Sequence, residues 1–200
     1  MLKIGVTGGI GAGKSTVCKL FEVIGIPVYY ADDRAKLLMQ KDAALIAEIT
    51  ATFGDQSYVD GQLNRSYLSE KVFKDTLQLQ KLNALVHPAV RKDVLRWVND
   101  QKNVSYVIQE AALLFESGGY KQLDKMITVH AALEDRIKRL KERDNSTDEQ
   151  IAARMRHQMQ DEEKMRLADF VVYNDQNHSL IKQVLTIHHL LVKESEHNTD

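Results

Sequence analysis

Apolar residues along this chain fall into short continuous blocks and into longer stretches where they recur every third or fourth position. Continuous blocks are typical of buried strands, and the longer spacing is typical of helices with one buried face. The blocks predict strands over residues 2–6, 26–30, 105–109, 125–130 and 170–173. Helices are predicted after residue 14, over 133–143, over 148–165, and over a closing stretch with an apolar stripe at Leu180, Val184, Ile187 and Leu191. This alternation predicts an α/β fold with a doubly wound parallel sheet.

Residues 35–99 break the alternation, because their spacing predicts helices only, over 43–53, 66–73, 76–86 and 88–98. A crossover between parallel strands needs a single helix, so this block is predicted to be a helical insertion at 32–101. The core is then expected at 1–31, 102–132 and 167–193 of a single domain over 1–200. Residues 133–166 form a further helical segment with a turn at 144–147, where Thr147 and Gln150 fit a capping box.

A glycine-rich segment follows the first predicted strand, and Gly8-Gly9-Ile10-Gly11-Ala12-Gly13-Lys14-Ser15 matches G-x-x-x-x-G-K-[ST]. Glycines allow successive backbone N–H groups to converge on an anion. Lys14 adds a positive charge for the β- and γ-phosphates, and the Ser15 hydroxyl suits Mg²⁺. The next helix directs its positive end at the same point. The segment therefore predicts a site for nucleotide phosphates, with Thr16 near the α-phosphate.

Two other sets of polar residues suit phosphoryl transfer. Asp32 follows the second predicted strand, at the sheet edge where ligands of such folds bind, and fits either a general base or a helix cap. Arg139 and Arg143 recur with Arg136 along one helix, which is typical of a lid that neutralises a transferred phosphate. A solvated face paired with neighbouring acidic residues is the alternative for these arginines.

The composition narrows the class of protein. The 200 residues are 44% hydrophobic and carry 27 basic against 28 acidic side chains, so there is no general attraction to nucleic acid or to an anionic membrane. The first strand begins at residue 2 and no apolar stretch is long enough for a membrane span, so we expect a cytoplasmic protein with small-molecule partners. Cys18, the single cysteine, is expected to be a buried thiol. Without a guanine-reading N-K-x-D segment, a small kinase is favoured over a GTP switch.

Several short motifs follow one another in order along the chain. Residues 6–16 are similar to V-T-G-G-I-G-S-G-K-S-T, and Asp60-Gly61-Gln62-Leu63-Asn64-Arg65 with Leu68 and Val72-Phe73 is similar to D-G-x-L-D-R-x-x-L-x-x-x-V-F. Residues 82–88 are similar to L-N-x-I-x-H-P, and residues 110–116 to D-x-P-L-L-F-E. The series ends with Arg139-Leu140, Arg143-Asp144, Arg154 with Gln158, and Ala168-Asp169 followed by Asn174. In their order and spacing, over nearly the whole chain, these motifs resemble those of the dephospho-CoA kinase family.

The resemblance implies a P-loop NTPase fold with a helical acceptor-binding insertion and a helical lid at 133–166. It implies ATP-dependent phosphorylation of the ribose 3′-hydroxyl of dephospho-CoA, which gives CoA and ADP in the last step of coenzyme A biosynthesis. ATP is the co-substrate, Mg²⁺ is held by Ser15, and the chain is expected to be a monomer or a weak homo-oligomer. By residue, ATP is bound by Gly11, Ala12, Gly13, Lys14, Ser15, Thr16 and Asn174. Catalysis is assigned to Asp32, Lys14, Arg139 and Arg143, and acceptor binding to Asp32, Arg65 and His87.

Departures from the family pattern leave other interpretations open. Tyr30 stands where the family often has a first Asp, Glu110 replaces an Asp, and Ala112 replaces a Pro. His87 with Pro88 also fits a helix start, and Arg65 a surface salt bridge. A nucleoside or nucleotide monophosphate kinase shares the expected core and lid, and a nucleotide-binding regulator without catalysis is the alternative from another class.

Overall fold

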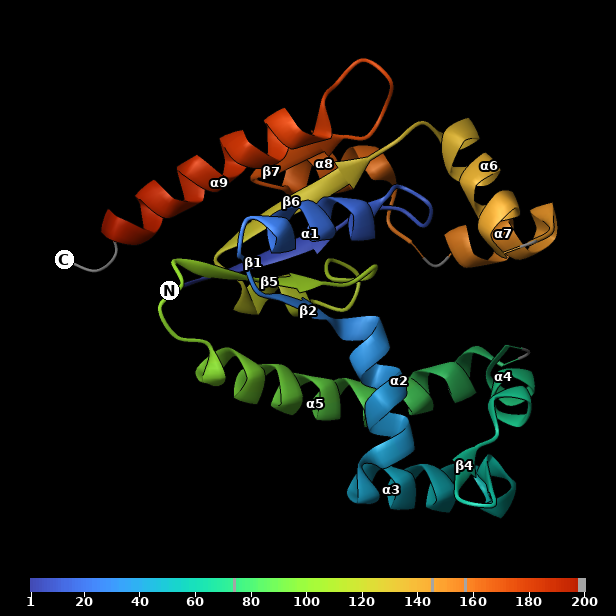
Figure 1. Cartoon of the computed structure of the whole chain (residues 1–200). Coiled ribbons are helices and arrows are strands. Elements are labelled where there is room, and N and C mark those ends of the chain that lie inside the picture. Colours follow the sequence, from blue (N-terminus) through green and yellow to red (C-terminus); the bar gives the residue numbers. More distant parts are fainter. Residues whose placement is uncertain (74, 145, 157, 198–200) are drawn as a thin grey trace. The chain divides into compact units, whose positions relative to one another are not determined.

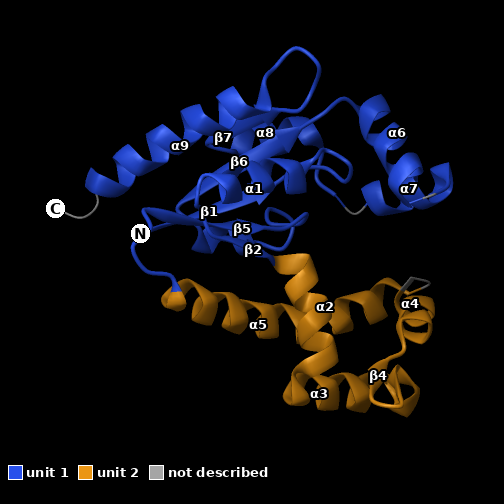
Figure 2. Cartoon of the chain, in the orientation of Figure 1, with its two compact units in different colours: residues 1–30, 101–200 blue, residues 31–100 orange. Residues whose placement is uncertain are grey.

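The computed structural model describes residues 1–73, 75–144, 146–156 and 158–197. It contains two compact units, one formed by residues 1–30 with 101–200 and the other by residues 31–100 (Figure 2). In the part of the chain that the structure describes, every helix is too short or too polar to span a bilayer.

The first unit contains a five-stranded parallel sheet of order β2-β5-β1-β6-β7 (Figure 1). Its strands are β1 (Leu2–Thr7), β2 (Val28–Tyr30), β5 (Tyr106–Glu110), β6 (Lys125–His130) and β7 (Phe170–Tyr173). The chain passes from β1 to one side of the sheet and later from β5 across β1 to β6, so the carboxyl end of β1 lies at a topological switch point. The predicted doubly wound α/β fold is confirmed.

The helices of this unit are α1 (Lys14–Val23), η2 (Gly119–Gln122), α6 (Leu133–Asp144), α7 (Asp148–Met155), α8 (Asp161–Leu167) and α9 (Leu180–His197). The main core lies where α1 and α9 pack on the sheet. Because side chains alternate between faces along a strand, Ile4 and Val6 of β1 point into this core together. They meet Val17, Cys18 and Phe21 from α1 and Val184, Ile187 and Leu191 from α9. Burial raises the pKa of the Cys18 thiol, as expected for a structural cysteine.

The second unit consists of helices with a small hairpin. Its elements are α2 (Ala31–Lys41), α3 (Ala43–Phe53), η1 (Asp55–Ser57), β3 (Tyr58–Val59), β4 (Gln62–Leu63), α4 (Arg65–Phe73) and α5 (Thr76–Asp100). Asp42 caps α3 by accepting hydrogen bonds from the N–H groups of Ala44 and Leu45 at 3.0 and 3.1 Å. The core of the unit contains Leu38, Leu45, Ile49, Phe53, Leu68 and Val86.

Two expectations for the second unit were wrong. The antiparallel pair β3–β4 interrupts the block that was predicted to be helical throughout. Asp60 and Gly61 join these strands with φ angles of 50° and 73°, the left-handed pair that a two-residue hairpin turn requires. Helix α5 runs unbroken through Pro88, where two helices were predicted. Its apolar stripe continues past Pro88 to Val90 against the core, so packing offsets the hydrogen bond that proline cannot make.

The helix predicted over 148–165 is also wrong, because the structure contains α7 and α8 in its place. Between them, the Met159 N–H donates to the Glu116 carboxylate at 2.8 Å and is taken out of helical bonding. Acidic residues at 161–163 then favour a new helix start. The capping box of Thr147 with Gln150 is confirmed, whereas residue 145 of the predicted 144–147 turn lies outside the described residues.

Candidate active site

The glycine-rich loop joins β1 to α1 at the switch point and forms one wall of a cavity of about 210 Å³. The lining residues are Gly11, Gly13, Lys14, Ser15, Thr16, Arg139, Leu140 and Arg143. The structure thus brings the loop and two of the candidate arginines together around one space. Ser15 and Thr16 lie exposed in the first turn of α1, where partial positive charge gathers, and the Thr16 N–H donates to the Gly13 carbonyl oxygen at 3.0 Å.

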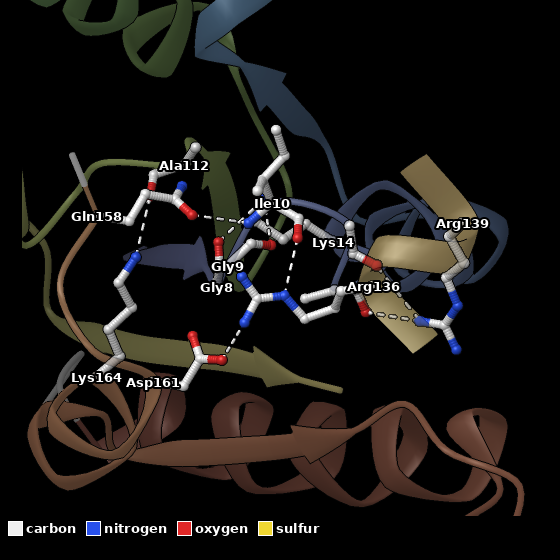
Figure 3. Close-up of polar contacts among 12 residues, drawn as sticks. Gly8, Gly9, Ile10, Lys14, Ala112, Arg136, Arg139, Gln158, Asp161 and Lys164 are labelled. Atoms are coloured by element: carbon white, nitrogen blue, oxygen red, sulfur yellow. Dashed lines mark hydrogen bonds and ion pairs between the residues drawn. The ribbon is translucent and has the colours of Figure 1, made fainter. Parts of the chain in front are cut away.

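Lys14 lies along the loop that precedes it. Its Nζ donates hydrogen bonds to the carbonyl oxygens of Gly8 at 3.1 Å and Gly9 at 3.4 Å (Figure 3). The charge of Lys14 is therefore held against the backbone of the loop at Gly8 and Gly9.

Gly13 is required by the approach of Asn174, which directly follows β7. The Asn174 side-chain amide donates to the Ala12 carbonyl oxygen at 2.8 Å. Gly13 has a φ of 96°, and a Cβ added there would lie 2.0 Å from the Asn174 amide nitrogen. Only glycine suits both the left-handed conformation and the contact.

The two cavity arginines come from α6 and differ in their partners. One guanidinium nitrogen of Arg139 donates to the Asn174 carbonyl oxygen at 3.1 Å, and another lies 3.5 Å from the carbonyl oxygens of Gly11 and Ala12. Arg143 is exposed and donates twice to the Asp144 carboxylate, at 2.7 and 2.9 Å. This fork raises the pKa of Arg143 and lowers that of Asp144.

Arg136, grouped with these arginines by sequence, has a different environment. Its side chain is buried, donates from Nε to the Ile10 carbonyl oxygen at 2.9 Å and pairs with Asp161 (Figure 3). Arg136 therefore holds the loop at Ile10, and the alternative of a solvated helical face does not apply to this arginine.

The remaining candidates belong to the second unit. Asp32 is exposed in the first turn of α2, Arg65 begins α4 and is exposed, and His87 lies in α5. Desolvation of the partly covered His87 ring, followed by the charge of Arg91, lowers the pKa of His87. The lowered pKa favours the neutral imidazole.

An ion pair that sequence reasoning missed fixes the helix that carries Asp32. Arg34 donates two hydrogen bonds of 2.8 Å to Asp93 of α5, whose side chain is buried. The two residues are 59 positions apart, so no local pattern indicated the pair.

A second missed pair lies in the first unit. The Nζ of Lys164, which is fully buried, lies 2.9 Å from a Glu116 oxygen and donates to the Ala112 carbonyl oxygen at 3.4 Å. Glu116 belongs to the motif at 110–116, but nothing local to Lys164 marked it as its partner.

Tyr30 shows how this chain accommodates a departure from the family pattern. Its hydroxyl donates to a Glu22 oxygen of α1 at 3.0 Å, and burial raises the pKa of Tyr30. Position 30 thus serves the contact between β2 and α1. Glu110 is buried at the end of the neighbouring strand, opposite Tyr30 in register.

Comparison of the sequence with known proteins shows the family to which this chain is similar. The model of the dephospho-CoA kinase family matches residues 2–179. The dephospho-CoA kinase of Salinibacter ruber is 44% identical over 179 residues, which cover 88% of this chain and 89% of that protein. The enzyme of that name from Bacteroides fragilis is 38% identical over 186 residues, which cover 93% and 91% of the two chains.

Solved structures of similar fold include a member of the same family. The dephospho-CoA kinase from Campylobacter jejuni has a TM-score of 0.70 and 27% identity, over 96% of this chain and 98% of that one. The shikimate kinase from Acinetobacter baumannii, in complex with shikimate, has a TM-score of 0.54 at 16% identity over 97% and 94% of the chains, which shows the shared fold alone. These matches cover nearly the whole chain, so this chain belongs to the dephospho-CoA kinase family, which phosphorylates dephospho-CoA with ATP in the final step of CoA biosynthesis.

Proposed function

We propose that this chain transfers the γ-phosphoryl group of ATP to the ribose 3′-hydroxyl of dephospho-CoA and releases CoA and ADP. The observation that carries the proposal is the cavity in which the phosphate-binding loop, Lys14, Arg139 and Arg143 meet, in a member of this family. Phosphoryl transfer needs little covalent help from the protein and depends on positioning and charge, which these residues supply.

In the proposed reaction, residues Gly11 to Thr16 bind the phosphates of ATP. Lys14 leaves its contacts with the loop carbonyls and follows the charge that develops on the transferred group. Arg139 and Arg143 neutralise the same charge from α6, with residues 133–166 acting as a lid. Asn174 holds the loop at Ala12 and flanks the bound nucleotide.

Asp32 is proposed to accept the proton of the 3′-hydroxyl as phosphoryl transfer proceeds. Its carboxylate is exposed and lies two residues beyond the carboxyl end of β2. Residues 32–101 are proposed to bind the acceptor, with Arg65 contacting its anionic groups. His87 would contribute a neutral hydrogen-bonding ring, consistent with its lowered pKa.

The donor set of the cavity fits Mg²⁺ delivered with ATP. Among the described residues there is no group of three or more His, Cys, Asp or Glu side chains that suits a metal ion. Mg²⁺ in kinases usually takes one or two protein oxygens together with phosphates and water, and the exposed Ser15 hydroxyl meets that need. When bound, the ion would neutralise negative charge on the phosphates, with Ser15 as its protein ligand. We further infer that the chain acts in the cytoplasm, as a monomer or weak homo-oligomer, on these two small molecules.

The first experiment supplies ATP, Mg²⁺ and dephospho-CoA and measures ADP release together with the mass of the product. Stoichiometric CoA is the expected result. A clear preference for a nucleoside monophosphate as acceptor would overturn the proposed substrate.

The role of Asp32 has its own test. Asp32→Asn should bind ADP normally and lower kcat by roughly 10²–10⁴-fold, the usual contribution of a general base. Asp33→Asn is the matched control, because Asp33 is exposed in the same turn and pairs with Lys36 at 2.8 Å. Normal turnover by Asp32→Asn would show that Asp32 is not the base.

A further inference from the structure

Ile10, in the middle of the phosphate-binding loop, has both of its backbone polar groups held by side chains. Its N–H donates to the Gln158 side-chain oxygen at 2.9 Å, and its carbonyl oxygen accepts from Arg136 Nε at 2.9 Å (Figure 3). Arg136 lies in α6 and Gln158 lies between α7 and α8. Two points near opposite ends of residues 133–166 are therefore attached to one residue of the loop.

The Arg136 side chain is fixed on several sides. It is only 5% exposed, and it pairs with Asp161 in the first turn of α8. A Cβ at Gly9 would lie 2.3 Å from the guanidinium carbon, so the absence of a side chain at position 9 makes room for Arg136. The planar fork of an arginine can bond a carbonyl and a carboxylate at once, which a lysine ammonium does not reproduce.

The segment that carries Gln158 and Asp161 is anchored in turn. The Met159 N–H and the buried Lys164 Nζ both contact the Glu116 carboxylate, at 2.8 and 2.9 Å. Thr128 Oγ1 of β6 donates to the Lys164 carbonyl oxygen at 3.3 Å. These contacts hold the segment that carries Gln158 and Asp161 to β6 and to Glu116.

We propose that Gln158, Arg136 and Asp161 form a clamp of positioning residues that shapes the loop before nucleotide binds. A glycine-rich loop loses much conformational entropy when it orders around an anion. By holding both peptide groups at Ile10, the clamp removes part of that cost in advance. The Ile10 N–H donates to Gln158, and residues Gly11 to Thr16, which are proposed to bind the phosphates, directly follow Ile10. The proposal rests on the proposed function for the identity of the nucleotide but not for that of the acceptor.

A preforming role makes a kinetic prediction that differs from general destabilisation. The clamp acts on the loop equally in ground state and transition state, so its loss should raise KM for ATP and Kd for ADP by one common factor. A single hydrogen bond predicts roughly a fivefold to tenfold change. The kcat at saturating substrates should stay within about twofold of wild type. A partly unfolded preparation would instead show a lower kcat with an unchanged Kd.

The test compares Gln158→Met, which deletes the acceptor and keeps the length of the side chain, with Gln160→Met. Gln160 is the matched control, because it lies two residues away, is exposed and makes no side-chain cap to α8. ADP binding is measured by calorimetry without acceptor, and KM and kcat in the coupled assay. Gln158→Met should show the common rise in KM and Kd, and Gln160→Met should match wild type.

Asp161→Asn tests the other arm of the clamp and should change Kd in the same direction, because Arg136 loses its charged partner. A wild-type Kd in both Gln158→Met and Asp161→Asn would overturn the proposal, as would a fall in kcat alone. Since ADP binding needs no acceptor, the two proposals fail separately. A wild-type chain that binds ADP but makes no CoA refutes the function and leaves the clamp standing.

Discussion

Replacing Lys164 with methionine removes a buried charge while keeping most of the side-chain volume. The Lys164 side chain is fully buried, and its partner Glu116 is 17% exposed. Deleting one member of such a pair leaves the other charge in a poorly solvated place, which typically costs about 3–5 kcal/mol. Because water reaches Glu116 in part, we expect about 3 kcal/mol. For a chain of this size, 1 kcal/mol moves the melting temperature by roughly 2–4 °C, so the expected fall is about 6–12 °C.

Thermal and urea unfolding, followed by circular dichroism, measure this effect. The double variant Lys164→Met with Glu116→Gln removes both charges, and its amide oxygen still accepts from the Met159 N–H. It should recover more than half of the lost stability. Lys36→Met is the control, because the Lys36–Asp33 pair is 55% and 74% exposed and should contribute nothing measurable. A Lys164→Met protein that melts within about 2 °C of wild type, or a double variant no better than the single one, would refute the reasoning.

Further predictions concern the loop and the closing helix. Lys14→Met should lower kcat/KM by roughly 10²–10³-fold in the coupled assay, because it removes a charge placed for the transferred phosphate, and an unchanged value would contradict that role. Gly13→Ala should weaken ADP binding by more than about tenfold in calorimetry, because its Cβ would lie 2.0 Å from the Asn174 amide nitrogen. Adding Asn174→Ala should restore only part of the lost affinity for ADP, because alanine at position 13 remains strained at a φ of 96°. Desolvation, followed by the nearby His189, lowers the pKa of His188, whose Nδ1 lies 2.8 Å from the Tyr106 hydroxyl. The unfolded chain takes up this proton near pH 6.5 and the folded chain resists it, so the free energy of unfolding should fall as the pH drops below about 6.5. Urea titrations at several pH values should show a smaller fall for His188→Gln, and an equal fall would count against the assignment.

Much of the first unit was predictable because its signals are local. The buried strands are continuous apolar blocks, and the loop residues that line the cavity lie within one stretch of sequence. The strands β6 and β7 have the predicted bounds, as does helix α3 in the second unit. The hairpin at 58–63 also had a local signal in Asp60-Gly61, but its strands of two residues each are too short to show a periodic pattern.

The missed features depend on residues that meet only after folding. Lys164 belongs to α8, and Glu116 belongs to the segment after β5. A single lysine in a polar stretch of sequence gives no sign that its side chain is buried. Arg136 shares a helical spacing with Arg139 and Arg143, but it lies near the start of α6. There its guanidinium contacts the Ile10 carbonyl oxygen and the Asp161 carboxylate. Periodicity identifies the face of a helix but not the partner that each turn of it will meet.

The fit between Gly9 and Arg136 links two positions that are far apart in the chain. The guanidinium occupies the volume that a side chain at position 9 would fill. We therefore expect the two positions to covary among related kinases, so that a relative with a side chain at position 9 has a shorter residue at position 136. The need for glycine at position 9 would then come from the packing of Arg136 as well as from phosphate binding.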